Sequence, residues 1–189
     1  MAGHEKKVEI EGAGEVSTES KEIAMLIAVL ALMLAITELL GNAAQVKNVQ
    51  SNIEASNLWS FYQAKAIRST TLETAAAQVE ADMVTITDPK QKEAREKLLA
   101  KWKGTMARYE NDPKTNEGRD QLKERAINAE HAREKYHHKH EKYEVAVGAF
   151  HIAIVLASAA IISGVMLLAW VSGALGVVGL INLALGWLI

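Results

Sequence analysis

The sequence predicts an all-α membrane protein with three transmembrane helices and a long helical domain between the first and the second. Residues 145–189 contain no Lys, Arg, Asp or Glu, and residues 23–40 form a second apolar run. A spanning helix needs about 20 apolar residues, so the longer run has room for two passes. Neither of the two prolines interrupts an apolar run. We therefore expect a helix content above about 75%, far beyond the third that is usual in globular proteins.

Residues 1–22 are polar and are expected to form a flexible, solvated tail. The acidic start and the lack of a small-residue cleavage site argue against a secretory signal peptide. Residues 23–40 are predicted to form the first membrane helix. Four alanines at helical spacing give this helix one small-residue face, suited to close contact with another helix: Ala24, Ala28, Ala31 and Ala35.

Residues 41–144 are predicted to form the helical domain, which holds 18 basic and 16 acidic residues. Helix-forming sequence without proline continues to Ile86, so a helix of ten or more turns beyond the membrane is expected. Asp88 is suited to cap a second helix over residues 90–110, with Pro89 at its first turn. Residues 111–118 form a loop by their breaker residues.

A last helix is predicted from Arg119 into the membrane. Residues along one side of it recur by four and three, which is typical of a coiled-coil seam, although two of them, Arg133 and His140, are ionisable. The seam residues are Leu122, Ala126, Ala129, Arg133, Tyr136, His140, Tyr143 and Val147. The domain is therefore expected to be a coiled-coil hairpin or a three-helix coiled coil.

Residues 145–189 are predicted to form a transmembrane hairpin, with spans near 145–162 and 165–187. The turn is expected at Ser163-Gly164, and Ser172-Gly173 is the alternative. Four glycines thin one side of the third span and could admit another helix of this or a neighbouring chain. They are Gly173, Gly176, Gly179 and Gly186.

Two sequence stretches carry a family resemblance. The first is Trp-Ser-Phe-Tyr-Gln-Ala-Lys-Ala-Ile-Arg at residues 59–68. The second runs from Glu130-His131 through Tyr136-His137-His138-Lys139-His140 into the apolar residues 150–158. Together they resemble the bacterial membrane-protein family named domain of unknown function 4337, over nearly the whole chain after the tail. The resemblance implies three membrane helices with a helical domain between the first two, and no assigned activity.

The composition narrows the function classes. A net charge of −2 lacks the positive excess that is typical of nucleic-acid-binding proteins. The absence of Cys from the sequence excludes disulfides and thiol catalysis. No nucleotide-binding loop, Ser/His/Asp set or paired-carboxylate site is visible, so we expect neither an enzyme nor a bound cofactor. The expected partners are the lipid bilayer and further copies of the chain, or other subunits of a membrane complex.

Orientation follows from the Lys and Arg residues near the membrane ends. Six lie on the domain side: Lys47, Arg125, Arg133, Lys135, Lys139 and Lys142. Three lie on the other side: Lys6, Lys7 and Lys21. This difference favours a cytoplasmic domain at the bacterial inner membrane.

A metal site is the first candidate for chemistry, in the His-rich helix. Glu134, His137 and Glu141 lie on neighbouring turns, and Glu134 with His137 makes a Glu-x-x-His pair of the kind that di-iron bundles use. No second Glu-x-x-His occurs, so a solvated charged face is the stronger interpretation.

A polar belt inside the apolar runs is the second candidate. Glu38, His151 and Asn182 all fall in the domain-side half of the predicted membrane region, where polar groups are costly. Glu38 and His151 are expected to lie within side-chain reach of each other. Either Glu38 reaches out to water and His151 donates a hydrogen bond to a neighbouring helix, or the two residues line a proton or ion pathway.

An aromatic cluster is the third candidate. Trp59, Phe61 and Tyr62 form the only such cluster in the polar domain. Packing against Tyr136 or Tyr143 of the returning helix is the main expectation, and a surface for a partner protein is the alternative.

The function predicted from these features is that of a membrane-anchored coiled-coil scaffold or accessory subunit that self-associates. An oligomeric proton or ion conductor that uses Glu38 and His151 is the first alternative. A metal-binding helical protein that uses Glu134, His137 and Glu141 is the second.

Overall fold

A computed structural model describes residues 18–189 as four α-helices, which make up 91% of the described residues. The helices are α1 (Thr18–Met83), α2 (Pro89–Glu110), α3 (Arg119–Ser163) and α4 (Met166–Leu188). Residues 18–189 contain no strand, and α1, α3 and α4 are each long and apolar enough to cross a membrane. The predicted all-α fold with three candidate spans is confirmed.

Helix α1 is one continuous helix of 66 residues. It begins at Thr18, so the end of the predicted tail 1–22 is helical, while residues 1–17 lie outside the described part. The helix ends at Met83, three residues before the expected end at Ile86. Residues 84–86 instead form tight turns, in which each amide donates to the carbonyl three residues earlier. The single glycine within α1, Gly41, costs about 1 kcal/mol of helix propensity, which the long flanking segments outweigh.

The breaks between helices lie where the sequence contains helix-breaking residues. Asp88 caps α2 by accepting a hydrogen bond from the Lys90 amide at 2.9 Å, with Pro89 in the first turn, as predicted. Asp112 orders the loop before α3. Burial alone would raise the pKa of this carboxyl, but hydrogen bonds from Thr115 and the charge of Arg108 lower it. An ionised Asp112 therefore holds the loop at neutral pH.

The chain divides into two units, and the described residues of the first are 18–40 and 142–188. Its helices pack large side chains onto glycines of α4. A Cβ on Gly176 would meet Leu30, one on Gly179 would meet Phe150, and one on Gly186 would meet Tyr143. Three of the four glycines on the predicted thin face are therefore covered by helices of this chain.

The turn between α3 and α4 lies at Gly164, which has a φ of +69°. Glycine adopts this left-handed conformation without the steric cost that a Cβ brings. The alternative turn, Ser172-Gly173, lies inside α4. Ser172 is fully buried there, and its hydroxyl donates to the Ala153 carbonyl of α3 at 2.7 Å.

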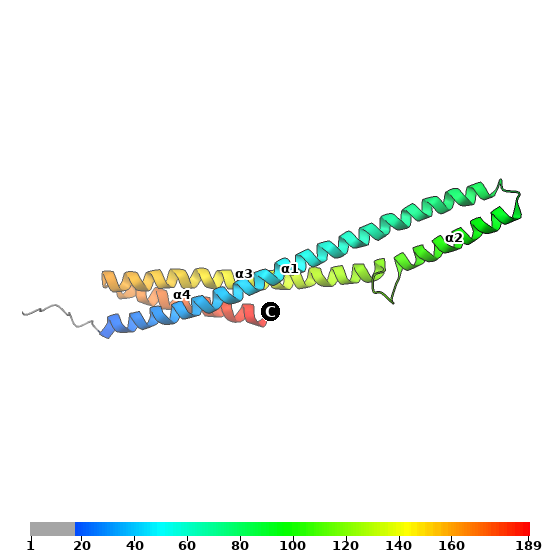
Figure 1. Cartoon of the computed structure of the whole chain (residues 1–189). Helices are drawn as coiled ribbons and strands as arrows, with labels where there is room; N and C mark the ends of the chain where they lie inside the picture. Colours follow the sequence, from blue (N-terminus) through cyan, green and yellow to red (C-terminus); the bar gives the residue numbers. More distant parts are fainter. Residues whose placement is uncertain (1–17) are drawn as a thin grey trace, which may run out of the picture. The chain divides into compact units, whose positions relative to one another are not determined.

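The second unit contains residues 41–141. Figure 1 shows α2 and α3 following one another along α1, so that each packs against a different part of it. One core cluster joins α1 to α3: Ala55, Leu58, Leu122, Ala126 and Ala129. The other joins α1 to α2: Ala76, Val79 and Leu99. Of the two expected forms, this unit is the hairpin, and it is only two helices thick.

Two glycines should respond in opposite ways to alanine. Gly104 lies in α2, where a Cβ would meet nothing within 4 Å, so Gly104→Ala should stabilise the protein by about 0.5–1 kcal/mol. At Gly118 a Cβ would collide with the backbone of Asn111 and Asp112, so Gly118→Ala should cost about 1–3 kcal/mol. Thermal unfolding in detergent, followed by circular dichroism, measures both. A Gly118→Ala protein as stable as wild type would contradict the close approach.

Candidate functional site

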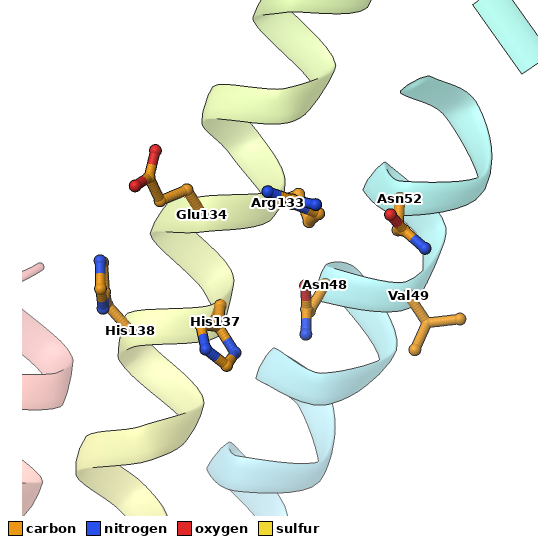
Figure 2. A pocket seen from close by; sticks show the side chains of 7 residues that line it. All are labelled: Asn48, Val49, Asn52, Arg133, Glu134, His137 and His138. Atoms are coloured by element: carbon orange, nitrogen blue, oxygen red, sulfur yellow. The ribbon is translucent and has the colours of Figure 1, made fainter. Parts of the chain in front are cut away.

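The His-rich part of α3 lines one side of a cavity of about 440 Å³ in the second unit. Helix α3 contributes Arg133, Glu134, His137 and His138, and α1 contributes Asn48, Val49 and Asn52. Figure 2 shows Arg133 and His137 on the side of α3 that faces Asn48 and Asn52. Glu134 and His138 project from the other side of the helix. The α3 side chains that face α1 are therefore a guanidinium and an imidazole.

The three weak metal candidates do not form a metal site in the described residues. Within residues 18–189, no group of three or more His, Asp or Glu side chains is arranged to hold a metal ion. Instead, the Glu141 carboxylate lies between two imidazoles, 3.4 Å from His137 Nε2 and 3.1 Å from His138 Nδ1. Glu134 and His137 point to different sides of α3 (Figure 2). Their i, i+3 spacing therefore does not converge on one point.

Arg133 occupies a seam position of α3, yet its side chain is exposed. The seam residues on the preceding turns, Leu122, Ala126 and Ala129, are buried against α1. At Arg133 the opposing residues are Asn48 and Asn52, and the cavity opens between the two helices. The sequence pattern places Arg133 in the seam and His137 among the metal candidates, but it did not point to the two asparagines. Their i, i+4 spacing on a helix with few charges was the signal that could have found them.

Of the predicted polar belt, the structure brings Glu38 and His151 together. Glu38 Oε1 lies 3.8 Å from His151 Nε2 in the first unit, and the two side chains are 49% and 56% exposed. Asn182 does not join them, since its amide donates to the Val178 carbonyl of its own helix at 3.0 Å. The pair lies on the outside of the packed helices, so a pathway lined by it needs a further copy of the chain.

Two members of the aromatic cluster are directed into the second unit. Trp59 Nε1 donates to Glu130 Oε1 at 2.8 Å, and the Trp59 and Tyr62 rings meet edge to face at 5.6 Å. Both rings pack against the α1–α3 core cluster, whereas Phe61 is 38% exposed. Among the three residues predicted as an interaction surface, Phe61 is the most available to a partner.

The expected packing of this cluster on Tyr136 or Tyr143 is wrong, and the antiparallel register of α1 and α3 gives the reason. His140 Nδ1 contacts the Gly41 carbonyl at 3.1 Å, so Tyr136, one turn away, lies level with residues shortly after Gly41. Trp59 is level with Glu130 instead. Tyr143 belongs to the first unit, where it covers Gly186.

Arg119 extends the polar contacts around Tyr62. Its guanidinium donates to the Tyr62 hydroxyl at 3.0 Å and to Glu110 Oε2 at 2.7 Å. The hydrogen bond to Tyr62 and the charge of Glu110 raise the pKa of Arg119 despite its partial burial. Tyr62 thereby links α1 to α3 and, through Glu110, to the end of α2. These contacts hold the hairpin together.

Each unit also leaves one face of α1 uncovered. In the first unit, all four alanines of the predicted small-residue face are exposed, whereas Ile23, Leu30 and Thr37 are buried. In the second unit, Val49, Ile53 and Ile67 are 46%, 55% and 67% exposed. Gly173 of α4 likewise has open space where a Cβ would lie. These surfaces are not used by contacts among the described residues.

Comparison with known proteins identifies the family. The sequence model of the family described as "Domain of unknown function (DUF4337)" matches residues 19–189, as the resemblance of the two stretches led us to expect. No curated protein matches the chain, and no solved structure matches it either.

The hydrogen bond between Trp59 and Glu130 should contribute measurably to stability. A partly buried bond to a charged acceptor is typically worth about 1.5–3 kcal/mol. Trp59→Phe and Glu130→Gln should each lower the melting temperature, and the double variant should lose less than the sum. Phe61→Tyr is the control, because it keeps the ring that faces Lys65 Nζ at 5.2 Å, and its expected change is below about 0.5 kcal/mol. Additive losses from Trp59→Phe and Glu130→Gln would show that the two side chains do not interact.

Proposed function

The chain belongs to the DUF4337 family, and we propose that it is a membrane-anchored helical scaffold that self-associates through the uncovered face of α1. The observation behind this proposal is the small number of charged residues in the segment 48–79. This part of α1 is solvent-facing in the second unit, but it lacks the charges that such a helix face normally has.

The contrast in charge between α1 and α2 is large. Residues 48–79 contain four charged residues among 32, and one of these, Lys65, is buried beside Glu117 at 3.8 Å. Helix α2 contains ten charged residues among 22. Both helices belong to the same hairpin, so a general requirement for solubility does not explain the difference. Depletion of charge at the core of a patch is typical of protein interfaces.

The hydroxyl groups on this face are satisfied within α1 itself. Ser60, Thr70, Thr71 and Thr74 each donate to the carbonyl four residues earlier, at 2.8–3.1 Å. Their donors therefore need no partner in solvent, and the threonine methyl groups remain available for packing. Such a face loses little hydrogen bonding when another helix covers it.

The occupant that fits this face is a second copy of the chain. Copies inserted in one membrane share one orientation, so the α1 helices of two neighbours run parallel and present identical residues to each other. Ile53, Ser60, Ile67 and Thr74 recur every seven residues, which is the spacing of a two-helix seam. A two-fold arrangement places each of them opposite its own counterpart.

The available contact is of the right size for an anchored dimer. Residues 48–79 extend over about 48 Å of helix, and a contact strip about 10 Å wide gives roughly 500 Å² per partner. The area buried on both partners together is then near the ~1,000 Å² that a specific interface needs. Membrane anchoring raises the effective concentration of the copies. The exposed alanines at residues 24–35 offer further close contact between membrane helices.

In this proposal the chain is not an enzyme, and its partners are the bilayer, its own copies and the other subunits of any complex it supports. The proposed location is the plasma membrane with residues 41–141 in the cytoplasm, because Lys and Arg are more numerous on that side.

An oligomeric proton or ion conductor is the second candidate. It is favoured by one contact, the 3.8 Å approach of Glu38 to His151 on the outer surface of the first unit. Association of several copies would enclose this pair. A structural pair needs only a hydrogen bond, whereas a proton pathway needs an imidazole that titrates near neutral pH.

Cysteine cross-linking tests the proposed dimer directly, because the native chain contains no Cys. Single cysteines at Ile53, Ser60, Ile67 and Thr74 should each give a disulfide-linked dimer in membranes, because a residue opposite its own counterpart can reach the Cβ separation of about 4 Å that a disulfide needs. Ile67→Glu should strongly reduce cross-linking of the Ser60→Cys protein, because it places two like charges in the contact.

Glu73→Cys is the matched control. Glu73 is exposed and lies about 120° around α1 from Ile67, so its cysteine should not cross-link. Equal cross-linking at Glu73 and Ile67 would indicate random collision. No cross-linking at any of the four seam positions would refute the proposed face.

Flux measurements separate the scaffold from the conductor. We expect liposomes with wild type, His151→Gln or Glu38→Gln to show no proton or cation flux above empty liposomes. His151→Gln should also be tolerated structurally, because an amide can still donate to Glu38. A wild-type flux that His151→Gln abolishes would overturn the scaffold proposal in favour of the conductor.

A further inference from the structure

The side of the cavity between α1 and α3 combines one guanidinium, one imidazole and two amides. These groups belong to Arg133, His137, Asn48 and Asn52, which all line the same 440 Å³ space. Figure 2 shows the two α3 side chains directed toward the α1 asparagines. Glu134 also lines the cavity, but its side chain is directed to the other side of α3 (Figure 2). Of these four donor residues, only His137 has a carboxylate partner, Glu141, which lies 3.4 Å from its Nε2.

Arg133 lacks the partners that most other arginines of the chain have. Arg95, Arg108 and Arg119 each contact a carboxylate, and Arg125 donates to the Asn116 carbonyl. Within residues 18–189, Arg133 makes no hydrogen bond or ion pair, and neither does Asn52. Asn48 uses one amide hydrogen in a long 3.4 Å contact with Gln45. Several donors are therefore free in one small space.

We propose that this cavity binds a phosphate-type oxyanion, with Arg133 as the principal ligand and the amides of Asn48 and Asn52 as additional donors. The planar guanidinium matches two oxygens of a tetrahedral anion, and such charge-assisted bonds are about twice as strong as neutral ones. His137 adds an N–H donor when Glu141, 3.4 Å from its Nε2, does not compete for it. This site does not depend on the dimer face, which involves other residues of α1.

The same chemistry is present in free phosphate compounds and in phosphomonoester lipid headgroups. A cavity of about 440 Å³ lies in the 300–1,000 Å³ range of small-molecule sites and admits either. The two sources share the tetrahedral anion that Arg133 would contact, and experiment can distinguish them.

Calorimetric titration of sodium phosphate into the full chain tests the site. The protein is held in phosphatidylcholine nanodiscs at pH 7, and sodium chloride at matched ionic strength is the reference. Wild type should show saturable heat with phosphate and none with chloride. Arg133→Gln should weaken phosphate binding at least about tenfold. Arg133→Lys should bind phosphate with intermediate affinity, because lysine keeps the positive charge but lacks the planar pair of N–H donors of the guanidinium.

Two further variants guard against indirect effects. Arg68→Gln removes an exposed arginine of α1 that makes no ion pair in the described residues, and it should bind phosphate like wild type. Asn52→Asp keeps the side-chain shape but places a negative charge opposite Arg133, so it should abolish binding. Circular dichroism shows whether Arg133→Gln alters the fold. If it does, Asn52→Asp still tests the cavity independently.

Repeating the titration in nanodiscs that contain phosphatidic acid identifies the source. If the headgroup occupies the cavity, the heat from free phosphate should disappear in wild type, and this supports a lipid ligand. If the heat is unchanged, the supported ligand is a soluble phosphate. Equal responses to phosphate and chloride, or equal affinity in wild type and Arg133→Gln, would overturn the proposal.

Discussion

The continuous helix α1 is the element on which the rest of the structure depends. In the first unit, Leu30 of α1 packs onto Gly176 of α4. Two large side chains of α3, Phe150 and Tyr143, pack in the same way onto Gly179 and Gly186 of α4. In the second unit, α2 and α3 pack in series along the same helix. Because a glycine cannot be enlarged without displacing its neighbour, these contacts determine how closely the membrane helices approach. They also determine which side of each helix remains free.

The second unit is thin because only one layer of helix covers α1. Two small clusters of mainly Ala, Leu and Val form its core. Specific polar contacts supplement this limited burial, since Trp59 bonds to Glu130 and Arg119 joins Tyr62 to Glu110. Such contacts set the register between antiparallel helices, which a seam of alanines alone specifies weakly. The aromatic residues are therefore explained mainly by the hairpin, and the face of α1 that the hairpin leaves uncovered is the better candidate for association.

The polar groups near the predicted membrane boundaries have different roles. Glu38 and His151 meet each other on the outside of the first unit. His137 and His138 of the second unit share the Glu141 carboxylate, so both imidazoles already have an acidic partner. Arg133 has no such balance in the described residues and faces two amides across a cavity. The unbalanced guanidinium, rather than the histidines that stand out in the sequence, is therefore the group best placed to bind a ligand.

The sequence by itself determined the helices, the three candidate spans and the breaks between them. The length of an apolar run determines whether a helix can span a membrane, and Asp88-Pro89 and Gly164 determine where helices begin and end. These effects are local, so they can be predicted without knowing which helices pack against each other. Tertiary structure alone decided which face of each helix is covered. Ala24 was recognisable as a member of a small-residue face, but its exposure depends on where α3 and α4 pack. The cavity joins Asn52 to Arg133, 81 positions apart, through a register that helical periodicity does not encode. Periodicity identifies residues that share a face, and only packing between helices decides what that face meets.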